Sequence, residues 1–253
     1  MDSLDAAQEL HEIALLAGAW IRGEAAPALN PLRPVREAVG EPQPLPEIHH
    51  DQPPNPQMDN TREERATALE SLRISFENCQ RCAIAAQRHS LVFGQGNPQA
   101  RLMLIGEGPG EQEDLHGIAF CGPSGELLTK MLAAIQLSRD EVYIANIIKC
   151  RPPQNRNPLP EEVANCRGYL DAQIDIIRPA LIATLGSVAI KTLVSGTEGV
   201  MRLRGQTLSY RGIPVVPTFH PSFLLRDPSH KRDAWEDLKR IRGILDSQAN
   251  ALR

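Results

Sequence analysis

The stretch RLMLIGEGPGEQED, residues 101–114, decides the fold because it joins a short apolar run to a loop rich in glycine and acidic residues. The apolar run ends at a glycine and predicts a buried β-strand. Glycines at three alternating positions would let the backbone that follows approach a ligand closely. The glycine spacing differs from G-x-G-x-x-G, no Lys-Ser/Thr follows, and the carboxylates of the loop would repel a phosphate. Taken alone, the loop is a strand-to-helix turn and not a nucleotide site.

Strands and helices alternate outward from this run. The apolar pattern predicts strands at 101–107, 142–150, 180–186 and 213–221, and helices at 124–135, 160–177, 187–194 and 231–245. This alternation predicts a three-layer α/β/α domain with a central, mainly parallel sheet. Ligands of such sheets bind beyond the carboxyl ends of the strands. We therefore expect the loops after the first, second and last of these strands to meet at one edge.

The first sixty residues differ from the rest of the chain. Residues 1–24 predict an amphipathic helix, for which no motif indicates a partner, and residues 25–60 hold 9 of the 21 prolines and predict an extended linker. The folded domain is expected to span residues 61–253. Residues 1–60 carry 3 basic and 10 acidic side chains, whereas 61–253 carry 24 basic and 21 acidic ones. The net charge of −4 therefore does not exclude a basic face that binds DNA.

Targeting signals are not apparent in the sequence. No run of eighteen apolar residues occurs, so no membrane span is expected. The short run IALLAGAW, residues 13–20, follows acidic residues and lacks the basic start of a signal peptide. We expect a cytoplasmic protein, in which five cysteines are metal ligands or buried thiols and not disulfides.

Four of the five cysteines form a candidate metal site. Cys79, Cys82, Cys150 and Cys166 have the spacing C-x2-C…C-x15-C, with no histidine nearby. Four thiolates suit either Zn²⁺ or an iron–sulfur cluster, and the spacing leaves both open. A thioredoxin-like redox pair is a further alternative, but no strand precedes the C-x-x-C. The fifth, Cys121, lies in the glycine-rich loop and is expected to be a small buried thiol.

Three segments together resemble the iron–sulfur (family four) uracil-DNA glycosylases. They are GEGPGEQED with Phe120 ten residues after Gly110, NIIKCRPPQNRNP (146–158) and HPSFLLR (220–226), and the resemblance spans roughly residues 68–247. It implies that the four cysteines hold one [4Fe–4S] cluster. It also implies an enzyme whose partner is uracil-containing DNA and which hydrolyses the N-glycosidic bond. No strand-scission lysine is evident, so we expect a monofunctional enzyme that leaves an abasic site, and we expect it to be a monomer.

The resemblance assigns roles in a pocket for a uracil that has left the base stack. Phe120 would stack on the uracil ring, although core packing is the commoner role of a phenylalanine. Asn146 would read the edge that bears N3–H and O4, since an amide offers a donor and an acceptor. Backbone groups of Glu107 and Gly108 would also contact the base. His220 would bind O2 and stabilise the leaving uracil anion.

The position of the attacking water is less clear from the resemblance. Related families place an Asp or Asn in the first motif, where this chain has Gly108. Glu113 is one candidate to position the water, although it could instead exclude the methyl group of thymine. Glu107 is the second candidate.

Contacts to the DNA are expected from residues that flank the three motifs. Arg151, Arg156, Arg226 and Lys231 would face phosphates, although solvated surface charge is their alternative role. Leu224 or Leu225 would enter the duplex as an apolar wedge where the base has left.

Two other classes of protein are weighed against this enzyme. A DNA-lesion or uracil-binding module of the same fold would not need the leaving-group residue His220. A zinc-stabilised hydrolase with another substrate would lack the absorption near 400 nm that an iron–sulfur protein shows.

Overall fold

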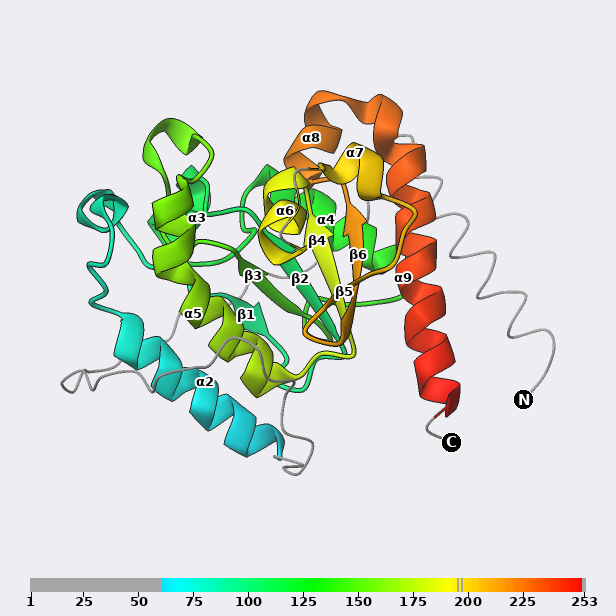
Figure 1. Ribbon diagram of the computed structural model, residues 1–253, viewed down its shortest axis with the longest axis horizontal. Coiled ribbons are helices and arrows are strands. Elements are labelled where there is room, and N and C mark those ends of the chain that lie inside the picture. The colour runs from blue at the N-terminus through cyan, green and yellow to red at the C-terminus, as the bar shows by residue number, and fades with distance from the viewer. Residues whose placement is uncertain (1–60, 195, 197, 252–253) are drawn as a thin grey trace.

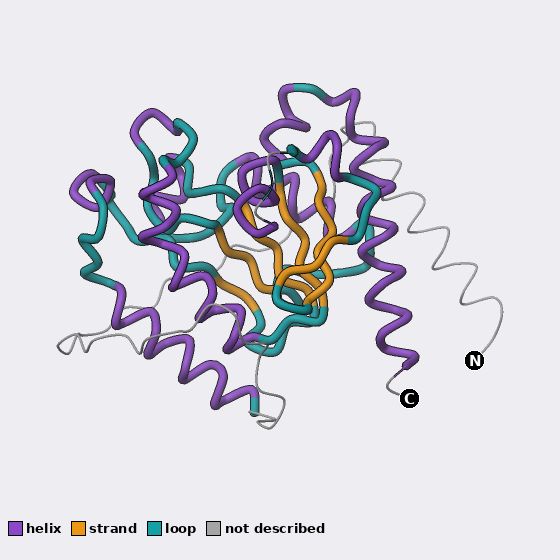
Figure 2. Tube along the Cα trace, viewed as in Figure 1, coloured by secondary structure: helices purple, strands orange, loops and turns teal. Residues whose placement is uncertain are grey.

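The computed structural model describes residues 61–194, 196 and 198–251. The helix expected at 1–24 and the linker expected at 25–60 lie outside these residues. A six-stranded sheet in the order β1-β3-β2-β4-β6-β5 forms the centre of the described part, with helices on both faces (Figures 1 and 2). This confirms the expected α/β class with a central sheet.

The sheet is parallel in its middle and antiparallel at its two edges. Its strands are β1 (Gln95–Gly96), β2 (Leu102–Gly106), β3 (Tyr143–Asn146), β4 (Leu181–Leu185), β5 (Leu208–Tyr210) and β6 (Ile213–Thr218). The pairs β2–β3, β2–β4 and β4–β6 are parallel, whereas β1 and β5 pair antiparallel with β3 and β6. The four expected strands are thus the four parallel ones, and the two short edge strands were not predicted.

The helices follow the strands in the order that the pattern predicts. They are α2 (Arg62–Phe76), α3 (Glu111–His116), α4 (Pro123–Ala133), α5 (Pro160–Ile177), α6 (Ser187–Val194), α7 (Val200–Leu203), α8 (Pro221–Arg226) and α9 (Lys231–Ala251), with 3-10 turns at Ala83–Gln87, Pro153–Asn155 and Pro228–His230. Helices α5 and α6 have the predicted bounds. Helices α2, α3, α7 and α8 were not predicted. Helix α2 is mostly polar and buries Leu69, Leu72 and Phe76, and the capping box of Thr61 and Glu64 marks its start.

Alternate residues of each strand face opposite sides of the sheet and build two cores. On one side Leu102 and Leu104 pack with α4 and α9, and on the other Met103 and Ile105 pack with α2, α5 and α6. Figure 1 shows α2 and α5 on one side of the sheet and α9 on the other. Both faces of the central strands are therefore buried, which is usual for parallel sheets. No helix in the described residues is long and apolar enough to cross a membrane.

Two strands end earlier than their apolar patterns predict. The strand expected at 142–150 ends at Asn146, because the chain then bends while Ile147 and Ile148 still donate to Gly106 and Glu107. The strand expected at 213–221 ends at Thr218, since His220 begins α8 as its N-cap. Both early ends place a polar side chain at the carboxyl edge of the sheet.

Replacing Gly125 by alanine should destabilise the domain. A Cβ there would collide with the main-chain oxygen of Phe120, and such overpacking costs about 1–3 kcal/mol. Gly243 on α9 is the matched control, because a Cβ there meets nothing within 4 Å and alanine favours a helix by up to ~1 kcal/mol. In urea unfolding, Gly125→Ala should lower the free energy of unfolding and Gly243→Ala should maintain or raise it. Equal stabilities for the two variants would contradict the packing described.

Candidate functional site

A pocket of about 710 Å³ opens at the carboxyl edge of the sheet. Its walls come from the segments that follow β2, β3, β4 and β6. Eight residues expected from the sequence line it: Glu107, Gly108, Glu113, Phe120, Asn146, Arg156, His220 and Arg226. The three motifs therefore meet in one place, as the topology of a parallel sheet requires.

Gly106, Phe120 and Asn146 form the closely packed inner end of the pocket. Gly106 pairs with Asn146 at the end of β2 and β3. A Cβ on Gly106 would collide with Oδ1 of Asn146 and lie 2.7 Å from Cζ of Phe120. Phe120 has a left-handed φ of 52° and is 5% exposed. Only glycine at 106 therefore leaves room for both side chains.

Asn146 presents a buried oxygen with nothing bound to it. Its side chain is 1% exposed, and Oδ1 has no hydrogen-bond partner in the described residues. An unsatisfied buried acceptor costs about 1–3 kcal/mol. Because Asn146 lines the pocket, a ligand with an N–H group could satisfy this oxygen.

His220 is held as a neutral imidazole of one tautomer. Its Nδ1 accepts from the main-chain N–H of Ser222 at 3.1 Å and lies 2.8 Å from the Ser222 hydroxyl. Burial, assisted by the charge of Arg226, lowers the pKa of His220 to about 4. Since Nδ1 is an acceptor, the single proton of the neutral ring is on Nε2. His220 lines the pocket beside Phe120, with 5.5 Å between the ring centroids.

The two candidate carboxylates have different surroundings. Glu113 accepts from the main-chain N–H groups of Gly110, Cys121 and Gly122, each at 3.1 Å, and so closes the loop that carries Phe120. Both of its oxygens are thereby engaged. Glu107 lines the pocket directly after β2, and burial raises the pKa of its carboxyl. The geometry favours Glu107 over Glu113 for contact with a water.

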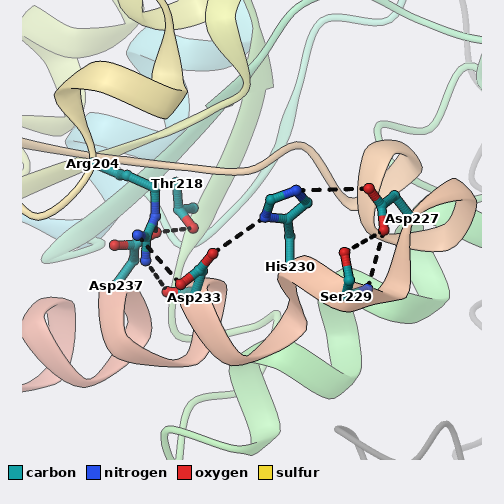
Figure 3. Close-up of polar contacts among 7 residues, drawn as sticks. All are labelled: Arg204, Thr218, Asp227, Ser229, His230, Asp233 and Asp237. Atoms are coloured by element: carbon teal, nitrogen blue, oxygen red, sulfur yellow. Dashed lines mark hydrogen bonds and ion pairs between the residues drawn. The ribbon is translucent and has the colours of Figure 1, made fainter.

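A polar network behind the pocket fixes the end of β6. Asp237, which is 1% exposed, accepts from Oγ1 of Thr218 at 3.0 Å and from Nε of Arg204 at 3.3 Å (Figure 3). Burial raises the pKa of the Asp237 carboxyl, against the effect of Arg204 and the bond from Thr218. Thr218 lies two residues before His220, so this network anchors the strand that ends in His220.

His230 extends the same network beneath α8. Its ring nitrogens lie 3.6 Å from Asp227 and 3.2 Å from Asp233 (Figure 3). The ring also packs on Phe219 and Phe223, whose own centroids are 5.3 Å apart in a stacked arrangement. Both phenylalanines line the pocket. The wall that contains His220 is therefore supported from behind by rings and ion pairs.

The arginines expected to face phosphate differ in their exposure and in their hydrogen-bond partners. Arg226 is exposed at the pocket. Arg156 forms a two-pronged pair with the buried Glu162, at 2.7 and 2.9 Å, and so holds the loop before α5. Arg151 bonds to Asn155 and lies 3.7 Å from Glu111.

Two of the residues expected to contact DNA are not placed to do so. Lys231 begins α9 and is 9% exposed, so most of its surface is covered. Leu224 is 0% exposed and belongs to the core beside α4 and α9. The wedge expectation is therefore corrected to Leu225, which is 45% exposed. The physical reason is that each residue of α8 is rotated by about 100° from the one before it, so Leu224 faces the core while Leu225 faces outward.

The pocket also contains residues that the sequence analysis missed. Gly186 and Ser187 follow β4 and line the pocket. Gly186 has φ +91°, and a Cβ there would lie 3.0 Å from Cβ of His220. Ser187 accepts from the N–H of Val200 at the start of α7. Their position directly after a parallel strand could have predicted that these residues line the pocket.

The four expected cysteines converge on one side of the sheet, away from the pocket. Cys150 and Cys166 are buried in the core that α2 and α5 cover, and Cys79 and Cys82 pack against it. Burial raises the pKa of Cys166 to about 12, and the neighbouring Cys150 and Cys82 thiols add to the rise. Cys121 lies elsewhere, in the loop closed by Glu113.

Arg88 was not expected from the sequence and lies beside these cysteines. Its guanidinium donates to the main-chain oxygen of Cys79 at 2.6 Å and to Sγ of Cys150 at 3.5 Å. It can thus stabilise a thiolate. Within residues 61–194, 196 and 198–251, no group of three or more His, Cys, Asp or Glu side chains is arranged to hold a metal ion.

Comparisons with known proteins agree with this arrangement. A model of the family described as the uracil DNA glycosylase superfamily matches residues 93–239. A type-4 uracil-DNA glycosylase of Thermotoga maritima is 40% identical over 192 residues, which cover 74% of this chain and 98% of that protein. Type-4 uracil-DNA glycosylases of Sulfurisphaera tokodaii and Archaeoglobus fulgidus are 40% and 36% identical, over 70% and 69% of this chain and 84% and 92% of theirs.

The neutral state of His220 can be measured by NMR titration of its ring. We expect a pKa of about 4, and a higher value in Arg226→Met that stays below ~6.5, since burial remains. The unfolded chain takes up this proton near pH ~6.5 and the folded chain does so only near 4, so His220 should reduce stability as the pH falls between them. A pKa near 6.5 in the wild type would show that the ring is solvated.

Proposed function

The chain belongs to the uracil-DNA glycosylase superfamily, and on that premise we propose that its pocket binds a uracil flipped from DNA. The protein is an enzyme of the type-4 class and excises uracil in DNA repair. We assign the activity to the domain that begins near Thr61.

The observation that carries the assignment of the pocket is the unpaired Oδ1 of Asn146. Uracil has an N3–H donor beside its O4 acceptor, and an amide side chain complements both. Cytosine has an acceptor at N3, which would face Oδ1 with no proton between them. Phe120 supplies the ring on which the base stacks, and the main chain at Glu107 and Gly108 completes the site.

His220 acts on the bond that breaks. A water oxygen forms a bond to C1′ of the sugar while the N1–C1′ bond breaks and its electron pair passes to the uracil, where O2 shares the negative charge. The Nε2–H of His220 donates to O2, and a donor aimed at developing charge is worth ~2.7–4 kcal/mol in the best-studied case. The water loses its proton to solvent or to a carboxylate, the uracil anion takes up a proton from solvent, and the products are uracil and an abasic sugar.

We assign Glu107 as the carboxylate that contacts this water. Glu113 is occupied by three main-chain N–H groups. The negative charge of Glu107 would also favour the cationic sugar of the transition state. Glu113 instead holds the loop that shapes the pocket.

The DNA strand is proposed to pass over Arg226 and Leu225 on α8. Arg226 would contact a phosphate, and Leu225 would fill the space that the flipped base leaves. Arg151 and Arg156 would contribute positive potential near the pocket while they hold their loop. Affinity should therefore fall as salt rises.

The four cysteines fit a [4Fe–4S] cluster better than one metal ion. The donor set is four thiols, and Arg88 donates a hydrogen bond to one of them. In such a cluster each thiolate binds a different iron, so the ligands need not surround a single point. When bound, the cluster would join the Cys79–Cys82 segment to the segment after β3 and to α5, and no step of the hydrolysis needs its redox chemistry.

Uracil excision is tested with an oligonucleotide that contains one uracil, followed by alkaline cleavage of abasic sites. The wild-type chain should cleave at uracil and leave a matched thymine or cytosine intact. Asn146→Ala should lose roughly 5- to 150-fold in rate, because a buried hydrogen bond to the base is worth ~1–3 kcal/mol. Asn97→Ala removes an amide from a turn away from the pocket and should match the wild type. Unchanged excision by Asn146→Ala would refute the assigned reading of the base.

The cluster assignment is tested by serine substitutions. Cys79→Ser, Cys82→Ser, Cys150→Ser and Cys166→Ser should each lose bound iron and the absorption near 400 nm, since each removes one thiolate. Cys121→Ser should keep both and serves as the matched control. Full iron content in any of the first four variants, or loss in the fifth, would show that the ligand set is wrong.

A further inference from the structure

Lys149 is a buried lysine between the pocket and the cysteines, and the mechanism above gives it no part. Its side chain is 0% exposed. Its Nζ donates to the main-chain oxygen of Asn146 at 2.9 Å and to Oε1 of Gln173 at 2.6 Å. Burying a lysine costs free energy unless its donors are satisfied. Because one of the two acceptors of Lys149 belongs to Asn146, which lines the pocket, the buried lysine is connected to the site.

The second partner of Lys149 is itself held in one orientation. Gln173 lies on α5 and is 0% exposed. Its Nε2 donates to the main-chain oxygen of Phe93 at 2.9 Å and lies 3.3 Å from the Tyr143 hydroxyl. The amide is therefore oriented with Oε1 toward Lys149, which connects the end of β3 to α5.

The main chain of Lys149 reaches the cysteine group. Its N–H donates to the thiol of Cys166, and its carbonyl accepts from Val92 at 2.9 Å. Cys150 is the next residue. Lys149 thus contacts Asn146 through its side chain and both buried cysteines through its main chain.

The contact matters because Asn146 is the last residue of β3. Beyond it the chain bends through 147–150. The peptide that joins Asn146 to Ile147 is held on one side by the bond from the Ile147 N–H to Gly106, and on the other side its carbonyl accepts from Lys149. The position of a short side chain follows that of its own main chain. A displacement of about 1 Å in a group that orients a substrate can cost ~10²-fold in rate.

We propose that Lys149 is a positioning residue for uracil recognition: by binding the Asn146 carbonyl it holds the Asn146 amide in place and ties it to the cysteine group. The proposal rests on the proposed function of Asn146. The role of Lys149 requires only that its Nζ carries N–H donors, and both the charged ammonium and the neutral amine have them. It differs from a general structural role, because its effect should pass through Asn146 alone.

The test is a double-mutant cycle on the full-length holoprotein, with single-turnover excision of uracil. Lys149→Met should lower the rate about tenfold in the wild-type background, since it leaves the buried Asn146 carbonyl unpaired. The same loss should appear with His220→Gln. With Asn146→Ala it should shrink below about twofold, because the amide to be positioned is gone. Lys191→Met, at an exposed position of α6, should have no effect.

A second readout does not depend on catalysis. Calorimetric titration with free uracil should show weaker binding for Lys149→Met and Asn146→Ala, while iron content and absorption near 400 nm remain those of the wild type. If Lys149→Met gives no soluble holoprotein, Lys149→Gln, which is too short to reach both acceptors, enters the same cycle.

Three results would overturn the proposal. They are an unchanged rate in Lys149→Met, an equal loss in all three backgrounds, and unchanged binding of free uracil. An Asn146→Ala variant that excises uracil normally would instead overturn the proposed function, and the role of Lys149 with it.

Discussion

The last parallel step between β2 and β3, where Gly106 faces Asn146, is the constraint on which the site depends. Only a residue without a Cβ at 106 leaves space for the amide of Asn146 and the ring of Phe120. The parallel register then brings the segments after β4 and β6 to the same edge, so His220 arrives beside Phe120. The base pocket is thus a consequence of strand pairing combined with one missing side chain.

The acidic loop after β2 no longer conflicts with an enzyme that binds DNA. Glu113 accepts from three main-chain N–H groups, and Asp114 accepts from those of His89 and Ser90. Glu113 thus stabilises the turn that carries Phe120, and Asp114 holds the segment at His89 and Ser90. Glu162 likewise accepts from Arg156 and so stabilises the loop before α5. Glu113, Asp114 and Glu162 are therefore internal hydrogen-bond acceptors, and Glu107 and Glu111 line the pocket with Glu113.

Several polar groups are buried here at a cost that packing alone would avoid. They include the unpaired oxygen of Asn146, the neutral His220 and the enclosed Lys149. Buried polar groups that lower the stability of the fold are usual where a site is preorganised for a ligand. The network of Arg204, Asp237 and Thr218 holds the end of β6, and the ring stack under α8 supports the same wall, which contains His220. A rigid frame of this kind keeps the donors and acceptors of the pocket in place.

The sequence by itself determined the four central strands, the helices α5 and α6, and the three motifs that end at one edge, because apolar periodicity and glycine are local properties. It also singled out four cysteines, although it left the metal open until the resemblance was considered. Only the tertiary structure decided that Leu224 is buried and Leu225 exposed, that Glu113 closes its own loop, that Arg88 lies beside the cysteines, and that the Lys149 side chain is buried against Gln173. Those facts depend on which segments pack together across the sheet, and contacts between residues distant in the chain leave no periodic signal in it.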